Sequence, residues 1–487
     1  MALALKNQAR QKAGPSITSE IARFAADTDY PALPSEVAAF GKVSILDTLG
    51  VAFAGAAIGE GCDALLSYAS AISQGGPARI WASGKRMPPA LAAFCNAAHA
   101  RCLDYDDIIE NPQIHVAVCV VPTAFAMAEA LNRPVSGKQL LTAVAIGSEV
   151  QSRLAAAIAR TQDASSFPVM LSTQVFGYFA AAATGGHLLD LDARRMQSAL
   201  GLAMMQATGT EEMVVHAPES VGKCIYASFS NQGGIQAAMM AAHGVAAPGA
   251  AFEGQAGLFE AYYRGRYDRD RLSDRLGGQY YSTERCFKMQ PGTLVSHAFA
   301  EAALIVMQTE GLRADDIFEA RLQVGGWGRA MCEPIEVRRN PPTAAAAMNS
   351  IPFIVAKAMV NGKVALTDFQ AKGRAQPESL DMAQRIRFIH DSALDNPAGL
   401  EPGLIDIVAR DGRVFTKRVN KPRGHPSRAV SFDEVATKFR DNAGYVKQLT
   451  PARIDQMIET VDRMDQLPDV GVLLDLMPSP SARGEVT

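Results

Sequence analysis

The sequence lacks the short motifs by which several common enzyme classes are recognised. It contains no G-x-x-x-x-G-K-[ST], G-x-G-x-x-G, G-x-S-x-G or H-E-x-x-H pattern. The usual signals of a phosphate-binding loop, a dinucleotide-binding fold, a hydrolase nucleophile elbow and a zinc protease are therefore missing. The seven cysteines form no C-x-x-C pair, which argues against a zinc ribbon, an iron–sulfur cluster and a disulfide framework. They are Cys62, Cys95, Cys102, Cys119, Cys224, Cys286 and Cys332.

Charge is also scarce. Charged residues make up 20% of the chain and the formal net charge is only -3, so nothing points to nucleic acid or a membrane as a partner. The first residues, MALALKNQARQKAG, have no signal-peptide core, and no uninterrupted apolar run approaches the roughly 20 residues of a membrane span. We expect a cytoplasmic protein. With 48% hydrophobic residues, 487 residues suffice for two or more buried cores.

The first half of the chain shows apolar residues at helical spacing in one segment after another. Ser136 is a plausible N-cap of one such helix, and Gly244 is a plausible stop of another. The pattern changes near residues 280–290, where segments of period two appear, and Asp411-Gly412 between two of them predicts a hairpin. Helices are predicted among these strands at 296–307 and in IPFIVAKAMVNG.

The tail after KPRGHPSRAV is helical again. We therefore predict a mainly α protein, in which a large helical domain is built from both chain ends and a smaller α+β lid domain is inserted between them. The predicted bounds are residues 1–282 and 423–487 for the helical domain and residues 283–422 for the lid. Such an arrangement leaves a cleft between the domains, where ligand sites are common.

One short segment, RCLDYDDIIENPQIH, holds four carboxylates, an arginine and a histidine close together. Apolar segments precede and follow it, so its carboxylates must be paired or have shifted pKa values. On a helix, Asp104 and Asp107 would share a face and Asp106 would be turned from both, so at least one is expected to be solvated or to cap. The plainer interpretation is a polar helix end before the Asn111-Pro112 turn.

Four further residues are candidates for chemistry. His115 opens the next apolar run and is a natural acid or base near neutral pH, although a lone histidine there is as often a core residue. Lys223 and Lys288 are isolated cations that either reach solvent or line a polar cavity. His297 begins a predicted helix nine residues after Lys288. One histidine, two lysines and an aspartate suggest a site that binds a small anionic acid and moves protons on it.

The order of these segments resembles that of the MmgE/PrpD family, which includes 2-methylcitrate dehydratases, cis-aconitate decarboxylases and iminodisuccinate epimerases. The resemblance covers nearly the whole chain. It rests on ITSEIARFAADTDYPALPSEVAAFGKVSILDTLGVAFAGA, on LDYDD with the following His115 and VVPTAFAMAEAL, on SGKQLLTAVAIGSEVQSRL, on GAAFEGQAGLFEAY, on KMQPGTLVSH and on PPTAAAAMNSIPFIVAKAMVNG.

The resemblance implies the two-domain fold predicted above, a homodimer, and chemistry on small di- or tricarboxylates without a metal or other cofactor. By motif match it implies that the catalytic residues are Asp104, His115, Lys223 and Lys288, with Asp106 a weaker candidate. Residues expected to contact the substrate are Arg101, Asp107, Ile108, Leu171, His297 and Phe353.

Three positions depart from the family pattern. Ile108 stands where many members have threonine, Leu171 where they commonly have histidine, and Phe353 where decarboxylases and dehydratases tend to have tyrosine. The resemblance therefore implies either a substrate less polar than a citrate-like acid or a reaction that needs fewer proton donors.

The sequence leaves three functions open. The first is a lyase that dehydrates or decarboxylates a small carboxylate, with His115 transferring the proton, Asp104 orienting or charging its partner, and Lys223 and Lys288 holding carboxylates. The second is an isomerase or epimerase of an amino- or iminodicarboxylate, which needs bases on both faces of a carbon. The third is a small-acid binding protein without turnover, which kinship of fold cannot exclude.

Overall fold

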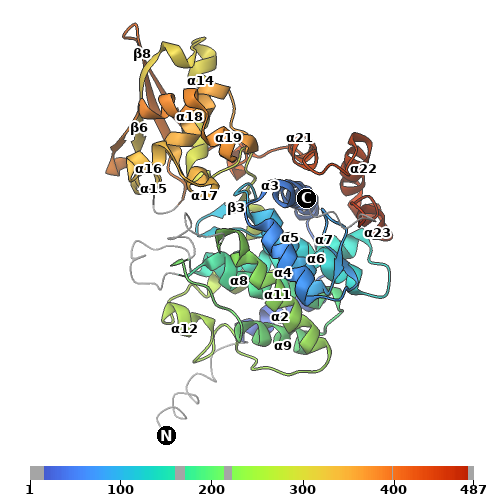
Figure 1. The fold of residues 1–487 in the computed structure, drawn as a ribbon. Coiled ribbons are helices and arrows are strands. Elements are labelled where there is room, and N and C mark those ends of the chain that lie inside the picture. Colours follow the sequence, from blue (N-terminus) through green and yellow to red (C-terminus); the bar gives the residue numbers. More distant parts are fainter. Residues whose placement is uncertain (1–15, 159–169, 213–221, 397–398, 481–487) are drawn as a thin grey trace.

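The computed structural model describes residues 16–158, 170–212, 222–396 and 399–480, with only the backbone for residues 222–224. Most of these residues lie in helices, as the sequence predicts, and strands are confined to short ladders and one four-stranded sheet (Figure 1). Figure 1 shows a sheet-containing part in yellow and orange above a larger helical part in blue and green, with the red C-terminal helices beside the latter.

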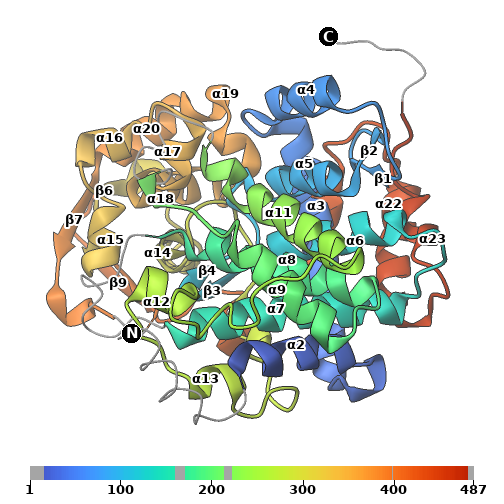
Figure 2. The same ribbon diagram turned by 90° about the horizontal axis from the view of Figure 1, so that it is seen from below.

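Two central helices, α8 and α11, organise the helical part, and α5, α6, α7 and α9 pack around them (Figure 2). Small residues bring α8 and α11 close together. A Cβ added at Gly234 would lie 2.4 Å from the Cβ of Ala181, so a larger side chain there would force the helices apart. The helices are α2 (Ile17–Asp27), α3 (Ser35–Ile58), α4 (Cys62–Ile72), α5 (Pro89–Arg101), α6 (Ala117–Ala130), α7 (Gly137–Ala157), α8 (Ser172–Leu188), α9 (Ala193–Met204), α11 (Gly222–Ala242), α12 (Leu258–Tyr263) and α13 (Asp270–Ser273).

Local signals set several helix ends where the sequence predicts them. Ser136 caps α7 through a capping box, in which its hydroxyl accepts from the backbone N–H of Gln139. Helix α11 ends at Ala242, and Gly244 follows with φ of 89°, a conformation that glycine adopts at little cost. The positions predicted for both signals are confirmed.

The sheet of the second part has the strand order β7-β6-β8-β9, with strands β6 (Ile317–Val324), β7 (Ile386–His390), β8 (Gly403–Ala409) and β9 (Val414–Val419). Strands β8 and β9 form the predicted hairpin around Asp411-Gly412, with Val408 opposite Val414. Strand β7 pairs with β6 in parallel, which the sequence analysis did not predict. Alternate residues of β8 are buried, so one face of the sheet packs on a core.

Helices α14 (Leu294–Thr309) and α18 (Ile351–Asn361) cover that buried face and confirm both helix predictions in this region. Shorter helices complete the part and supply residues to the cavity described below. They are α15 (Gly326–Ala330), α16 (Ile335–Arg339), α17 (Ala344–Met348), the 3-10 turn η6 (Leu366–Phe369), α19 (Ala371–Arg374) and α20 (Pro377–Gln384).

After the sheet the chain returns to the helical part through α21 (Phe432–Ala443), α22 (Pro451–Asp462) and α23 (Gly471–Leu474). Helix α21 packs on α3, where the rings of Phe53 and Phe439 meet edge to face at 6.1 Å. Gly50 permits this approach, because a Cβ there would lie 3.0 Å from the Phe439 ring. Residues from both ends of the chain, such as Ile21 and Val461, thus belong to one buried cluster, while the division into two domains and its bounds stay predictions.

Helix α3 is the one described helix that is long and apolar enough to cross a membrane by length and composition. It contains no uninterrupted apolar run of that length, since Lys42 and Asp47 lie among its apolar residues. Of its most apolar stretch, 78% is buried inside the protein and is not exposed on its surface. The apolar residues of α3 therefore form part of the helical core.

Candidate active site

The acidic segment leaves the helix before its first aspartate. Helix α5 ends at Arg101, and Asp104 has φ of 47°, a left-handed conformation that aspartate tolerates better than most residues. The chain then enters the short strand β3 (Ile108–Glu110). The expectation of a helical face shared by Asp104 and Asp107 is therefore wrong, because the backbone reverses at Asp104 and lets both carboxylates, and that of Asp106, turn into the protein.

A small sheet of three short strands brings Lys288 next to the acidic segment. Strand β5 (Arg285–Cys286) pairs with β3 so that Cys286 lies opposite Ile108, and β4 (Gln113–Ile114) pairs on the other side. Lys288, two residues beyond β5, donates to both the backbone carbonyl of Asp104, at 2.9 Å, and its Oδ1, at 2.7 Å. The predicted pairing of a cation with this segment is thus confirmed for Lys288.

Arg101 joins two of the carboxylates. Its Nη1 lies 3.0 Å from Oδ1 of Asp104 and 3.0 Å from Oδ1 of Asp106, and its Nε donates to the hydroxyl of Tyr226 at 2.9 Å. All of these residues are buried. Burial by itself would raise the pKa of Asp106, but Arg101 and His115 outweigh it and hold that pKa below its ordinary value. Asp106 is therefore ionised at neutral pH.

His115 is held by the same segment. Its Nδ1 lies 2.8 Å from the carbonyl oxygen of Asp107, to which it is hydrogen-bonded, and 2.9 Å from Oδ2 of Asp106, whose carboxylate lies alongside. Burial, with help from Arg101, lowers the pKa of His115 although Asp106 opposes the shift. The imidazole is therefore neutral at pH 7 with the proton on Nδ1, and no described residue donates to Nε2. A neutral imidazole with a free Nε2 is suited to taking up a proton.

This arrangement changes the roles expected from the sequence. Asp106, which the sequence ranks below Asp104, is the carboxylate that lies beside His115. Asp104 is instead bound to Arg101 and Lys288. Asp107 has a structural role: its Oδ1 accepts from the backbone N–H of Ala117 at the start of α6, and its Oδ2 lies 2.7 Å from Arg285. The expectation that one aspartate caps a helix is confirmed for Asp107.

A second buried ion pair, between α3 and α21, supports the site from behind. Nζ of Lys438 lies 2.6 Å from Oδ1 of Asp47 and donates to the carbonyl oxygens of Tyr105, at 2.8 Å, and Lys288, at 2.9 Å. Burial raises the pKa of Asp47 to about 6 and lowers that of Lys438. Lys438 thus fixes the backbone of both segments that carry the site. This ion pair was not predicted from the sequence. The one local sign of it is the carboxylate of Asp47 within the apolar helix α3.

The buried charges are balanced within the described residues. Asp47, Asp104, Asp106 and Asp107 are paired with Lys438, Arg101, Lys288 and Arg285. Ligand atoms of Asp104, Asp106 and His115 lie within 4.8 Å of one another, which is close enough to bind a metal ion. However, Arg101 and Lys288 both donate to Oδ1 of Asp104, and a divalent cation there would be repelled by two positive charges at contact distance. As arranged, this set does not fit a metal.

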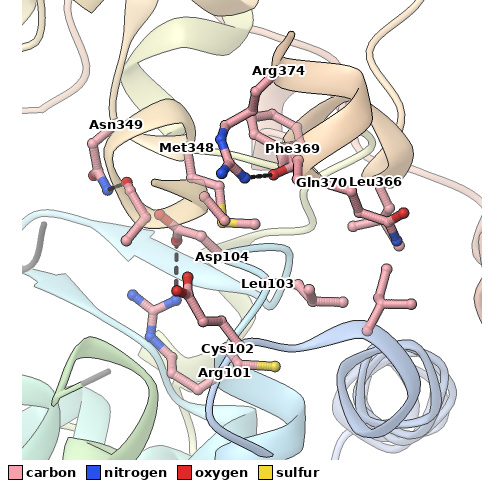
Figure 3. Close-up of a pocket in the computed structure, with 15 residues that line it drawn as sticks. Arg101, Cys102, Leu103, Asp104, Met348, Asn349, Leu366, Phe369, Gln370 and Arg374 are labelled. Atoms are coloured by element: carbon pink, nitrogen blue, oxygen red, sulfur yellow. Dashed lines mark hydrogen bonds and ion pairs between the residues drawn. The ribbon is translucent and has the colours of Figure 1, made fainter. Parts of the chain in front are cut away.

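A cavity of about 320 Å³ opens beside Arg101 and Asp104, between the helical part and the sheet-containing part (Figure 3). The helical part contributes the ends of α3 and α5 and the turn that follows α5, and the other part contributes α17, η6 and α19. The lining residues are Ile58, Glu60, Arg101, Cys102, Leu103, Asp104, Ala344, Ala345, Met348, Asn349, Leu366, Phe369, Gln370, Ala371 and Arg374.

Of the predicted site residues whose side chains are described, only Arg101 and Asp104 line this cavity. His115, Lys288 and Asp107 belong to the buried charged cluster beside it and are not among the lining residues, and the other predicted residues lie elsewhere. Ile108 packs in the core of the sheet-containing part, Leu171 in the helical core just before α8, and Phe353 in a third buried cluster on α18. His297 is buried on α14, where burial lowers its pKa to about 3 and Nε2 lies 3.3 Å from the carbonyl oxygen of Gly292. Lys223 belongs to the first turn of α11, and its side chain lies outside the described residues.

Comparison with known proteins places the whole chain in one family. Residues 19–270 match the MmgE/PrpD N-terminal domain and residues 291–463 match the MmgE/PrpD C-terminal domain. The chain therefore belongs to the MmgE/PrpD family, as its sequence motifs predict.

Several curated relatives share a single name. The cis-aconitate decarboxylase of Mus musculus is 26% identical over 461 residues, which cover 92% of this chain and 90% of the mouse protein. That of Homo sapiens is 26% identical over 457 residues, with 90% of each chain covered. The cis-aconitate decarboxylase of Aspergillus terreus is 24% identical over 500 residues, with 98% of each chain covered.

Proposed function

We propose that this protein is a carbon–carbon lyase that decarboxylates a small unsaturated di- or tricarboxylate of the cis-aconitate type. The observation that carries the proposal is the similarity to cis-aconitate decarboxylases over nine-tenths or more of both chains. The geometry of His115 and the cations around it supports it. Loss of carbon dioxide leaves an electron pair on carbon, which a neighbouring carboxylate delocalises and a proton then quenches.

His115 supplies that proton in the proposed reaction. In the free protein the imidazole is neutral, because burial and Arg101 hold its pKa down. An anionic substrate brings negative charge close to the ring and favours its protonated form. Asp106 stabilises the resulting imidazolium through Nδ1, 2.9 Å away, and Nε2 delivers the proton to carbon. Lys288 and Arg101 meanwhile keep the nearby carboxylates neutralised.

A second candidate function follows from the same histidine. A neutral imidazole with a free Nε2 is also placed to remove a proton next to a carboxylate, which is the first step of a dehydration or an epimerisation. In that case the protein would exchange a substrate proton with solvent without releasing carbon dioxide.

Proton NMR of the purified protein with cis-aconitate and related acids in deuterated water separates these functions. Decarboxylation predicts a product with one carboxylate fewer and deuterium either at the carbon that lost carbon dioxide or at the far end of the adjoining double bond, to which the electron pair is delocalised. Exchange without loss of carbon dioxide would instead support the isomerase, and binding without any change would support the non-catalytic protein. We also propose that the reaction needs no metal, because the buried charges balance without one. Turnover should survive dialysis against EDTA, and loss restored by a divalent cation would overturn this part.

A further inference from the structure

The cavity beside the charged cluster has two chemically different ends. At one end lie Arg101 and Asp104, which belong to the proposed reaction site. Away from them the wall is apolar, formed by side chains from both parts of the protein (Figure 3). These apolar side chains are Ile58, Leu103, Met348, Leu366 and Phe369, with Ala344, Ala345 and Ala371 between them. The remaining lining residues are Glu60 and Cys102 from the helical part and the polar residues Asn349, Gln370 and Arg374 from the sheet-containing part.

A compact tricarboxylate would use this space poorly. Every carbon of such an acid carries or adjoins a carboxylate, so filling the cavity with it would press ionised groups against Leu103, Met348 and Phe369. Moving a carboxylate from water to an apolar wall without a cation costs several kcal/mol. Of the two described cations in the lining, Arg101 is neutralised by Asp104 and Asp106. Arg374 donates to the carbonyl of Phe369 at 2.6 Å and can neutralise a carboxylate only at its own, polar side of the lining, away from Leu103.

An apolar group suits the space much better. A cavity lined by such side chains gives water few partners and gains free energy when hydrocarbon fills it. About 320 Å³ lies within the range of small-molecule sites and exceeds what the carboxylate end of a substrate needs. We infer that the acid on which this enzyme acts carries an apolar arm, an alkyl chain or ring, that extends from the reacting carboxylate past Leu103 into this cavity. This inference rests on the proposed function and narrows its substrate class.

A series of maleates that carry methyl, propyl or pentyl at carbon 2 tests the inference, because the two carboxylates stay constant while the arm grows. We expect the dissociation constant, measured by calorimetry, to fall about fourfold per added methylene until the cavity is full. In Ala345→Leu the new side chain occupies the cavity, so the dependence on chain length should vanish. Ala330→Leu, an exposed alanine of α15 outside the cavity lining, should keep it.

Each outcome has one meaning. Equal affinity for all three maleates, or a chain-length dependence unchanged in folded Ala345→Leu, would overturn the apolar arm while leaving the lyase proposal intact. The same holds if no maleate binds but cis-aconitate is decarboxylated. If no maleate binds and no acid is turned over, both proposals fail. Melting temperature reports whether Ala345→Leu is folded, and Ala344→Leu, in the lining of the same cavity, is the second variant if it is not.

Discussion

Variants of Lys438 test whether this residue only stabilises the fold or also positions the residues of the site. In Lys438→Met, Asp47 would lose its cation inside the protein, and the carbonyls of Tyr105 and Lys288 would lose their donor. Breaking a buried ion pair by removing one partner costs about 3–5 kcal/mol. We expect the free energy of unfolding at pH 7, measured by urea denaturation, to fall by that amount.

The double variant Lys438→Met, Asp47→Leu then distinguishes two roles. Replacing both charges by apolar groups should restore most of the lost stability, because no buried charge is left unpaired. The catalytic efficiency, kcat/KM, should stay about 10- to 100-fold below that of the wild type, because the backbones that carry Asp106 and Lys288 are no longer held together. Recovery of full activity in the double variant would show that Lys438 does not position the site.

A matched control lies on the same helix. Arg440 forms an exposed ion pair with Asp455 at 2.8 Å, with about half of each side chain in solvent. Such pairs contribute roughly 0–1 kcal/mol, so Arg440→Met should change the free energy of unfolding little and leave kcat/KM unaltered. If Lys438→Met were no less stable than Arg440→Met, the reasoning about the buried pair would be refuted.

Three further predictions concern histidines and their partner. His115 must be protonated in the free protein before it can donate a proton to the substrate. The catalytic efficiency, kcat/KM, for decarboxylation should therefore fall as the pH rises above the lowered pKa of His115. If kcat/KM fell only as the pH was lowered, His115 would be acting as a base. Asp106→Asn removes the charge that stabilises the imidazolium and should lower kcat/KM about a hundredfold. It also takes a buried carboxylate from Arg101, so the melting temperature should fall too, and the rate is measured where circular dichroism shows a folded variant; an unchanged rate would refute the role given to Asp106. Burial lowers the pKa of His99 to about 4, so the unfolded chain binds more protons than the folded one below pH 6.5. The free energy of unfolding in urea should therefore fall by roughly 3 kcal/mol between pH 7 and pH 4. His99→Phe should reduce this loss, and an equal loss in that variant would contradict this cause.

Features that depend on neighbouring residues could be predicted from the sequence. The cap at Ser136, the stop at Gly244 and the hairpin at Asp411-Gly412 all stand where the pattern places them. The requirement that carboxylates between two apolar segments be paired also holds, since Asp104, Asp106 and Asp107 each have a buried cation within 3.0 Å.

Features that depend on residues far apart in the sequence could not be predicted from it. Lys438 and Asp47 are 391 residues apart, and neither carries a local signal of the other. The parallel pairing of β7 with β6 is likewise invisible to periodicity, because only tertiary contact selects the neighbour of a strand. The motif match predicts Asp104 as the partner of His115, whereas the carboxylate beside the imidazole is that of Asp106, because the chain has left the helix and Asp104 adopts a left-handed conformation. The apolar residues at 108, 171 and 353 lie in buried cores, so their bearing on the substrate stays a prediction.

The central claim is that His115 moves the proton in the reaction, and its removal tests that claim most directly. The turnover number of His115→Ala, followed by NMR with the best substrate of the wild type, should fall at least a hundredfold while the melting temperature shows a folded protein. His187→Ala is the control, because this histidine of α8 contacts the carbonyl of Ala25 away from the site, and its turnover should match that of the wild type. Turnover by His115→Ala equal to that of the wild type would contradict the account.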